Sequence, residues 1–145
     1  MPADADPYAP LPLFVYGTLR PGLANHARFC ADVAPVRRAA VAARLYRMPD
    51  GFPVIVPDPH GRVLGELLAF PDPAAALRRI DPLEDVDPLA AARPEARYQR
   101  RVILAQPLDT GLPEPAWAYV SDAARVVDAT EIPGGDWIAV GGRGE

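Results

Sequence analysis

The sequence contains no lysine, so all 15 of its basic residues are arginines. These arginines are scattered along the chain, with only short pairs at 37–38, 78–79 and 100–101, and the formal net charge is −4. Proteins that bind nucleic acid usually concentrate positive charge on one face. We therefore expect no nucleic-acid partner.

Cysteine and serine each occur only once, as Cys30 and Ser121. A single cysteine excludes an internal disulfide framework and is typical of a reducing compartment, so we expect a cytoplasmic protein. Ser121 lies in no recognisable nucleophile motif, which argues against serine-type catalysis. His26 precedes Cys30 by one helical turn, but a free cysteine in an apolar helix is more typical of packing than of catalysis.

Metal and cofactor motifs are also missing. His26, His60 and Cys30 are too few and too badly spaced for a zinc site. No GxGxxG opens a helix, and the Gly-Thr-Leu-Arg-Pro-Gly stretch at 17–22 lacks the lysine of a phosphate-binding loop. We expect neither a metal ion nor an organic cofactor.

Long apolar runs are absent too, because none approaches the ~20 residues of a membrane span. The N-terminal stretch carries acids and prolines, so we expect no export signal and no membrane partner. With 145 residues, 50% of them hydrophobic, the chain suits one soluble domain. We expect that domain at 12–138, with flexible tails at 1–11 and 139–145.

The 19 prolines lie between apolar runs and delimit many short elements. Asp72 and Pro73 are typical of a helix start, and 107–115 is typical of a hairpin connection. Apolar alternation favours an α+β domain with a curved sheet or barrel and two packed helices. The expected strands are 13–16, 41–46, 53–56, 63–70, 98–105 and 116–120, and the expected helices are 23–33 and 73–83.

Carboxylates remain as candidates for chemistry, and only six glutamates occur. Four of these, at 95, 114, 131 and 145, lie in polar or proline-rich segments typical of solvent exposure. Glu66 follows Gly65, a position that suggests a β-bulge, and alternation favours an outward-facing side chain. Glu84 follows the apolar face of the second helix, beyond Pro82, where a carboxylate can face a cavity. Its pattern alone is more typical of a surface charge.

The turn Tyr16-Gly17-Thr18-Leu19 ends a short apolar run. A strand that stops in this way presents backbone N–H groups, which can hold a carboxylate or a developing oxyanion. Glycine after a strand is equally typical of a plain turn. Tyr98, Trp117 and Tyr119 would ordinarily belong to a sheet core.

Taken together, these segments resemble the γ-glutamylcyclotransferase-like superfamily, especially its small bacterial AIG2-like and γ-glutamylamine cyclotransferase-related members. The first block, Tyr16-Gly17-Thr18-Leu19 with its flanks, is the most specific, and the others gain weight from their order. The matching segments are 13–22, 25–26, 51–53, 63–67, 80–84, 98–102, 116–119 and 132–137.

The resemblance implies a β-barrel core flanked by helices and a pocket for a γ-glutamyl group at the 16–19 loop. It implies that Glu84 acts as general base in a cyclisation that releases 5-oxoproline and an amine. Tyr98 and Tyr119 would shape the pocket. The partner would be a small γ-glutamyl substrate, and the protein a monomer or weak homodimer. A binding or regulatory module that keeps the pocket without turnover is the alternative, and a scaffold domain is a third.

Overall fold

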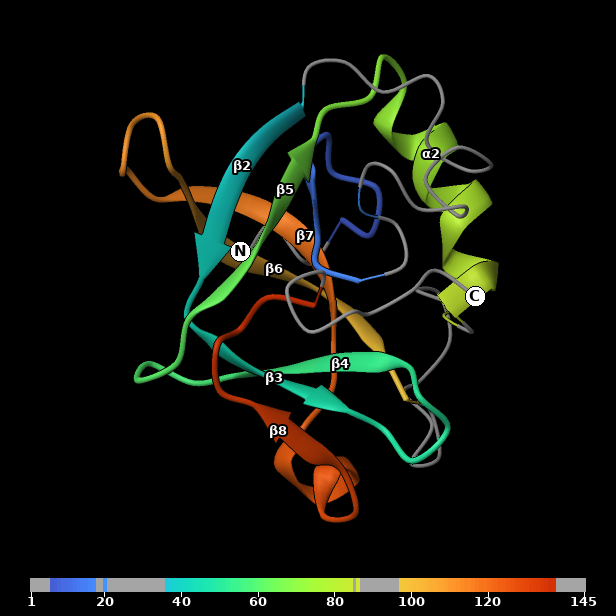
Figure 1. The fold of residues 1–145 in the computed structure, drawn as a ribbon. Helices are drawn as coiled ribbons and strands as arrows, with labels where there is room; N and C mark the ends of the chain where they lie inside the picture. The colour runs from blue at the N-terminus through green and yellow to red at the C-terminus, as the bar shows by residue number, and fades with distance from the viewer. Residues whose placement is uncertain (1–5, 18–19, 21–35, 85, 87–96, 138–145) are drawn as a thin grey trace.

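In the computed structural model, residues 6–17, 20, 36–84, 86 and 97–137 are described. They form two sheets, one α-helix and two short 3-10 turns (Figure 1). The elements are β1 Leu13–Val15, β2 Val36–Val41, β3 Ala43–Arg47, β4 Pro53–Pro57, β5 Val63–Leu68, α2 Pro73–Ile80, η2 Asp81–Glu84, β6 Gln99–Pro107, β7 Glu114–Val120, η3 Ala123–Val126 and β8 Thr130–Ile132.

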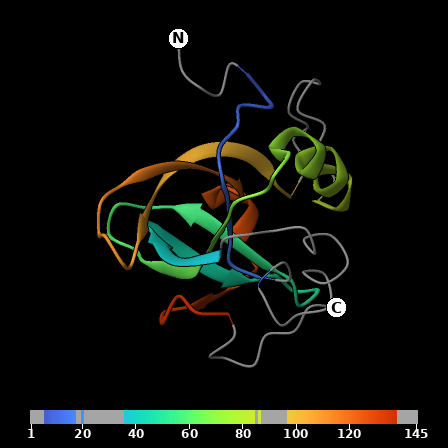
Figure 2. The same cartoon turned by 90° about the horizontal axis from the view of Figure 1, so that it is seen from above.

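Five of the strands close into a barrel in the order β1-β5-β2-β6-β7. Most neighbours pair in antiparallel fashion, whereas β1 meets β7 in parallel through Leu13 and Trp117 and so closes the ring. Seen from above, the strands form a ring and α2 lies outside it (Figure 2). The mixed sheet that closes into a barrel confirms the expected fold class, including the hairpin between β6 and β7.

A second sheet has the order β4-β3-β8 and lies at one end of the barrel (Figure 1). The single strand expected at 41–46 was wrong, because the chain breaks at Ala42 and changes sheets there. Val41 ends β2 in the barrel, and Ala43 begins β3 in the second sheet. At this break, the carbonyl oxygen of Ala42 accepts a hydrogen bond from the backbone amide of Asp58 at 3.1 Å. The strand β8 was not expected, since three residues give no readable alternation.

The helix α2 begins as its sequence predicts. The Asp72 side chain accepts a hydrogen bond from the Ala75 amide at 3.1 Å, and Pro73 occupies the first turn. The expected helix at 73–83 is shorter than predicted, because Pro82 cannot continue the α-helical ladder and the chain tightens into η2. The other expected helix, 23–33, lies outside the described residues.

Two clusters of buried apolar side chains hold the two sheets and α2 together. One fills the barrel and continues under the small sheet, and it includes Phe14, Leu67 and Trp137. The other lies between the barrel wall and α2. Residues 6–11, taken from the sequence as part of a tail, pack on this second core, and the Trp117 indole N–H donates to the Ala9 carbonyl at 2.9 Å.

Gly65 forms no bulge, contrary to the sequence expectation. The register of β5 runs without interruption past Gly65, which pairs with Ala39 of β2. A Cβ atom at this position would lie 2.1 Å from the Val15 carbonyl oxygen and 2.8 Å from the Phe14 ring. The glycine is therefore required because the backbone of β1 and an aromatic ring cross it closely.

Among the described helices, none combines the length and the apolar character that crossing a membrane requires.

We expect Gly65→Ala to destabilise the protein by ~3 kcal/mol, because the added methyl meets backbone rather than a movable side chain. Urea denaturation followed by tryptophan fluorescence measures this loss. Gly134→Ala is the matched control, since nothing lies within 4 Å of its added Cβ. Equal stability of the two variants would contradict the packing argument.

Candidate active site

The strand β1 delivers Tyr16 and Gly17 to the edge of the barrel. Tyr16 is buried, and its hydroxyl donates to the Tyr119 carbonyl oxygen at 2.6 Å. A Cβ at Gly17 would lie 2.4 Å from the Pro53 ring, so the turn packs directly against β4. Thr18 and Leu19, the other expected loop residues, lie outside the described residues.

Glu84 lies at the end of η2, where its side chain is partly buried. Burial raises the pKa of this carboxyl from 4.5 to about 7, although the nearby positive charge of Arg97 acts in the opposite direction. A carboxyl with such a pKa exchanges protons near neutrality. The surface-charge interpretation, which its sequence pattern favoured, is therefore not supported by its surroundings.

Three tyrosine hydroxyls lie within electrostatic reach of Glu84. Burial is the main cause that raises the pKa of Tyr16, Tyr98 and Tyr119, and the negative charge of Glu84 adds to the rise for each. The structure thus brings together side chains that are far apart in sequence, from the end of β1, from η2, from the start of β6 and from β7. Four of the residues predicted from sequence lie in this group.

The hydrogen bonds of these tyrosines have a common direction. The hydroxyl of Tyr98 donates to the Pro53 carbonyl, and that of Tyr119 donates to the Asp81 carboxylate at 2.6 Å. Tyr16 also uses its proton, on the Tyr119 carbonyl. A hydroxyl whose proton is engaged offers a ligand only acceptor lone pairs. The Tyr98 hydroxyl also accepts from Arg97, and that of Tyr16 accepts from the Ile55 backbone, which leaves the Glu84 carboxylate and the Tyr119 hydroxyl as acceptors for a hydrogen-bond donor such as an ammonium group.

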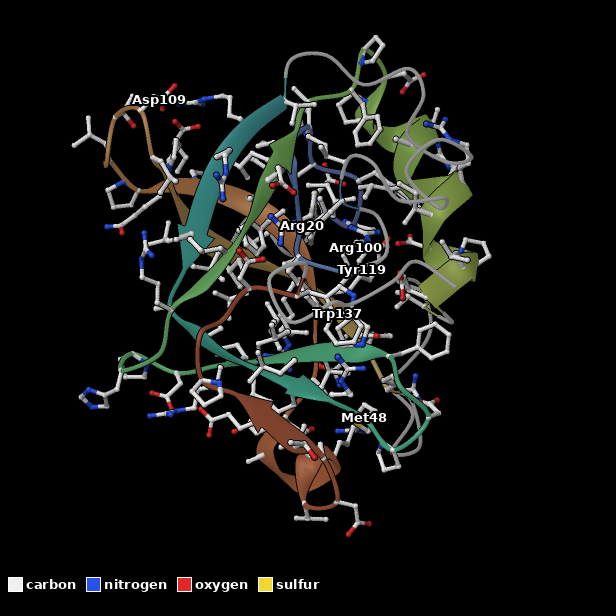
Figure 3. The ribbon with its side chains drawn as sticks, viewed as in Figure 1. Arg20, Met48, Arg100, Asp109, Tyr119 and Trp137 are labelled. Atoms are coloured by element: carbon white, nitrogen blue, oxygen red, sulfur yellow. The ribbon has the colours of Figure 1, made fainter. Side chains whose placement is uncertain are left out.

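Asp81 anchors the turn that carries Glu84. The Arg100 guanidinium grips this carboxylate with two hydrogen bonds, of 2.7 and 3.0 Å, and both side chains are almost fully buried. Arg100 also lies over the Trp117 ring, 4.4 Å from its centroid. The Tyr119 hydroxyl donates to the same Asp81 carboxylate, and Arg100 and Tyr119 lie close together in Figure 3. Since Asp81 is the first residue of η2, this paired charge ties the start of the turn to β6 and β7.

A second buried ion network supports the loop that begins at Gly17. Arg20 forms a fork with both oxygens of Glu66, at 2.8 and 2.9 Å, and donates to Asp136 at 2.7 Å. The backbone amide of Arg20 closes a turn onto the Gly17 carbonyl at 3.0 Å. The sequence expectation of an outward-facing Glu66 was wrong, because the side chain is buried and the Arg20 guanidinium compensates its charge.

Sequence reasoning missed several charged residues of this region, namely Arg20, Asp81 and Arg97. Arg20 follows the loop motif directly, and Asp81 stands one turn before Glu84, so proximity to a motif was the available signal. What the pattern lacked was any sign of the long-range partners of these residues. Within the described ranges, no three His, Cys, Asp or Glu side chains gather as a metal ion would require.

A comparison with protein-family models matches residues 13–139 to the family described as gamma-glutamyl cyclotransferase, AIG2-like. This match covers most of the chain. The chain belongs to this AIG2-like family. This match confirms the family resemblance that the sequence motifs suggested. No curated protein sequence matches the chain.

Solved structures of low sequence identity share the fold of this AIG2-like chain. YkqA from Bacillus subtilis superposes with a TM-score of 0.62 at 23% identity, over 88% of this chain and 39% of its own. A mouse AIG2-like protein has a TM-score of 0.61 at 22% identity, over 81% of this chain and 82% of its own. An uncharacterized protein, PH0828 from Pyrococcus horikoshii, has a TM-score of 0.59 at 18% identity, over 90% and 92%.

These likenesses concern architecture. The chain spans well under half the length of YkqA and most of the length of the mouse protein. For this AIG2-like protein, the fold is what these comparisons share.

We expect Arg20→Met to destabilise the folded state by ~4 kcal/mol, because two carboxylates lose a buried partner. The double variant Arg20→Met with Glu66→Met should recover much of this loss. Denaturant midpoints of the single and double variants measure the coupling. Arg37→Met is the control, since its partner Asp109 is exposed and its partner Glu114 is only half-buried, and it should change the midpoint little.

We expect Glu84→Gln to stabilise the protein at pH 8. The folded-state pKa of about 7 lies above the ordinary 4.5, so the stabilising proton is held at low pH and lost as pH rises through 7. At ~1.4 kcal/mol per unit, the ionised carboxyl costs about 3 kcal/mol at pH 8. Thermal denaturation at pH 4 and pH 8 should show the gain only at pH 8, and Asp128→Asn, an exposed change, should show none.

Proposed function

We propose that this protein cyclises a small γ-glutamyl amide or amine to 5-oxoproline and releases the amine, with Glu84 as general base and acid. The observation that carries the proposal is the Glu84 carboxyl, which has a pKa of about 7 and lies within electrostatic reach of three tyrosine hydroxyls whose own protons are donated elsewhere. Family membership supports a reaction of this kind.

The substrate carries its own nucleophile, the α-amine, a few bonds from the γ-carbonyl. The α-ammonium group would bind the acceptor cluster and pass one proton to Glu84. The amine nitrogen would then attack the γ-carbon, and a five-membered ring would form because the two groups are held together. As the bond from the γ-carbon to the leaving nitrogen breaks and the γ-carbonyl re-forms, Glu84 would give its proton to that nitrogen. The ring nitrogen still carries two protons at this stage, and Glu84 would accept the second one and pass it to the released amine, which departs as an ammonium ion, so protons and charge balance.

The raised pKa of Glu84 matters for this transfer. An α-amine has a pKa of ~8, and an ordinary glutamate lies nearly four units below it, which opposes proton transfer by ~5 kcal/mol. With a carboxyl pKa of about 7, the gap is about one unit, or ~1.4 kcal/mol. Burial of Glu84 thus makes the carboxyl a usable base at neutral pH.

The loop of Tyr16, Gly17, Thr18 and Leu19 would supply hydrogen-bond donors, in contrast to the acceptors around Glu84. Its backbone N–H groups would hold either the α-carboxylate of the substrate or the oxyanion formed at the γ-carbon. Tyr98 and Tyr119 would border the α-ammonium side. The substrate supplies the nucleophile, and Glu84 moves the proton, so no cofactor takes part in these steps. We also propose a cytoplasmic protein that acts as a monomer or weak homodimer.

We expect wild-type protein to release 5-oxoproline from a γ-glutamyl dipeptide and Glu84→Gln to lose this activity by at least ~100-fold. Mass spectrometry of the product measures both rates. Because the base must be ionised, kcat/KM of the wild type should fall about tenfold per pH unit below pH 7. Asp128→Asn controls for the loss of an exposed carboxylate and should keep the wild-type rate.

If wild-type protein binds γ-glutamyl compounds and Glu84→Gln binds them as well, while neither turns one over, the protein is a binding module and the enzymatic proposal fails. If the residual kcat/KM of Glu84→Gln still falls below pH 7 as that of the wild type does, the group that titrates is another residue than Glu84.

A further inference from the structure

A pocket of about 230 Å³ lies where β4, β6 and β7 meet the turn η3. Side chains alternate between the two faces of a strand, so Gln99 and Arg101 lie on the face of β6 opposite Arg100, which holds the turn of Glu84. The pocket is therefore separate from the candidate active site. Its lining residues are Val56, Pro57, Arg97, Gln99, Arg101, Val120, Ser121, Asp122, Ala123 and Arg125.

The charges around this pocket do not cancel. Three arginines line it, and two of them have an acidic partner. Arg97 pairs with Asp50, which lies just outside the lining, and Arg125 pairs with Asp122. Arg101 donates only to a neutral side chain within the described part of the chain. Three cations against two anions leave one positive charge in excess, which favours an anionic ligand.

The polar side chains of the wall also offer donors to a ligand. The Gln99 side-chain oxygen accepts twice from Arg101, at 3.0 and 2.6 Å, so the amide nitrogen of Gln99 is the part left to face the pocket. The two carboxylate oxygens of Asp122 accept from the backbone amide and from the guanidinium of Arg125. An oxyanion supplies the acceptors that match such donors.

Ser121 adds a buried donor. Its backbone amide donates to the Ile55 carbonyl at 2.8 Å, and the residue is only 7% exposed. Its hydroxyl oxygen is buried and has no hydrogen-bond partner among the described residues. Buried polar groups are normally paired, so an oxygen atom of a ligand in the pocket would give this hydroxyl the partner that it lacks.

Arg97 connects this pocket with the candidate base. It lines the pocket, its guanidinium donates to the Tyr98 hydroxyl, and its positive charge favours the ionised form of Glu84. An anion in the pocket would offset part of that charge. The anion and the Glu84 carboxylate would therefore weaken each other, because both are attracted to one guanidinium and they repel each other.

We propose that this pocket is a binding site for a small oxyanion, held by Arg101, Gln99 and Ser121, and that its occupant acts on Glu84 through Arg97. The ligand is a carboxylate or a tetrahedral oxyanion such as phosphate or sulfate, since either places several acceptors on one charged group. The site is distinct from the proposed substrate site, and it does not depend on the proposed function. By linkage, ionisation of Glu84 weakens anion binding by the same factor by which the anion weakens that ionisation.

Titration with sulfate, followed by NMR of the backbone amides, tests the site. In wild-type protein at pH 8, the Ser121 amide should shift with sulfate concentration. Arg101→Gln should weaken this binding ~10-fold and Ser121→Ala ~3-fold, because a charged and a neutral hydrogen bond are lost. Arg38→Gln is the matched control, since Arg38 is exposed and lies outside the pocket, and it should keep the wild-type affinity. No sulfate binding, or an equal loss in Arg101→Gln and Arg38→Gln, would overturn the site.

The action on Glu84 is measured by the same titration at two pH values, because sulfate keeps its charge between them. At pH 8, Glu84→Gln should bind sulfate ~3-fold more tightly than wild type, since the repelling carboxylate is gone. At pH 5, the wild-type carboxyl, with its pKa of about 7, holds its proton, so the two proteins should bind alike. Equal affinities at pH 8 would overturn the coupling.

The other groups around Glu84 keep their charge state over this range. Arg97 stays positive, and its pairing with Asp50 holds the pKa of that carboxyl below its ordinary value. Burial raises the pKa of the nearby tyrosine hydroxyls, which therefore stay neutral. A difference between pH 5 and pH 8 that disappears in Glu84→Gln thus belongs to Glu84, whereas one that persists in this variant would contradict the coupling.

Acetate and chloride identify the class of ligand. Acetate is a planar carboxylate and sulfate a tetrahedral oxyanion, and whichever binds more tightly through Arg101 gives the geometry of the natural ligand. Chloride at the same ionic strength controls for screening of charge and should bind more weakly than either. Chloride binding that is as tight and depends equally on Arg101 would show that the pocket selects charge alone, and it would overturn the oxyanion assignment.

Discussion

The guanidinium of Arg20 is the constraint on which the candidate site depends, because it joins three distant parts of the chain. It pairs with Glu66 in the barrel wall and Asp136 after β8, while its own backbone closes the turn that begins at Gly17. A guanidinium keeps its charge over the whole physiological pH range, whereas a lysine ammonium loses its proton readily when buried. In a chain without lysine, this buried contact stays charged at the pH values at which Glu84 titrates.

The barrel also brings the hydroxyls of three tyrosines within electrostatic reach of the Glu84 carboxyl. Tyr16 directly follows β1, Tyr98 directly precedes β6 and Tyr119 lies in β7, and each directs its proton to a backbone carbonyl or to Asp81. The protein's own polar groups therefore determine what a ligand finds there. Because Arg100 and Asp81 hold the turn of Glu84 in place, the carboxyl can be kept in a poorly solvated position without the turn moving outward.

Local patterns were sufficient to predict a curved sheet or barrel and the capped start of α2, whereas the group of Tyr16, Tyr98, Tyr119 and Glu84 was predicted from the family resemblance. They failed where distant contacts decide the outcome. Gly65 forms no bulge because a ring from another strand crosses it, and Glu66 is buried because Arg20 reaches it. The change of sheets at Ala42 left no trace in a run of alanines. Charge partners separated by tens of residues cannot be inferred from alternation or capping alone.

The way in which the barrel closes has a mechanical consequence. Between β1 and β7 the ladder has a single register pair, Leu13 with Trp117, whereas the hairpin of β6 and β7 is zipped along seven. Local opening needs least free energy where the fewest bonds must break, so this seam is the weakest line around the cylinder. The turn at Gly17 leaves the barrel two residues beyond the end of β1. Transient local opening between β1 and β7 can therefore loosen the turn at Gly17 while the other strand pairs of the barrel stay intact.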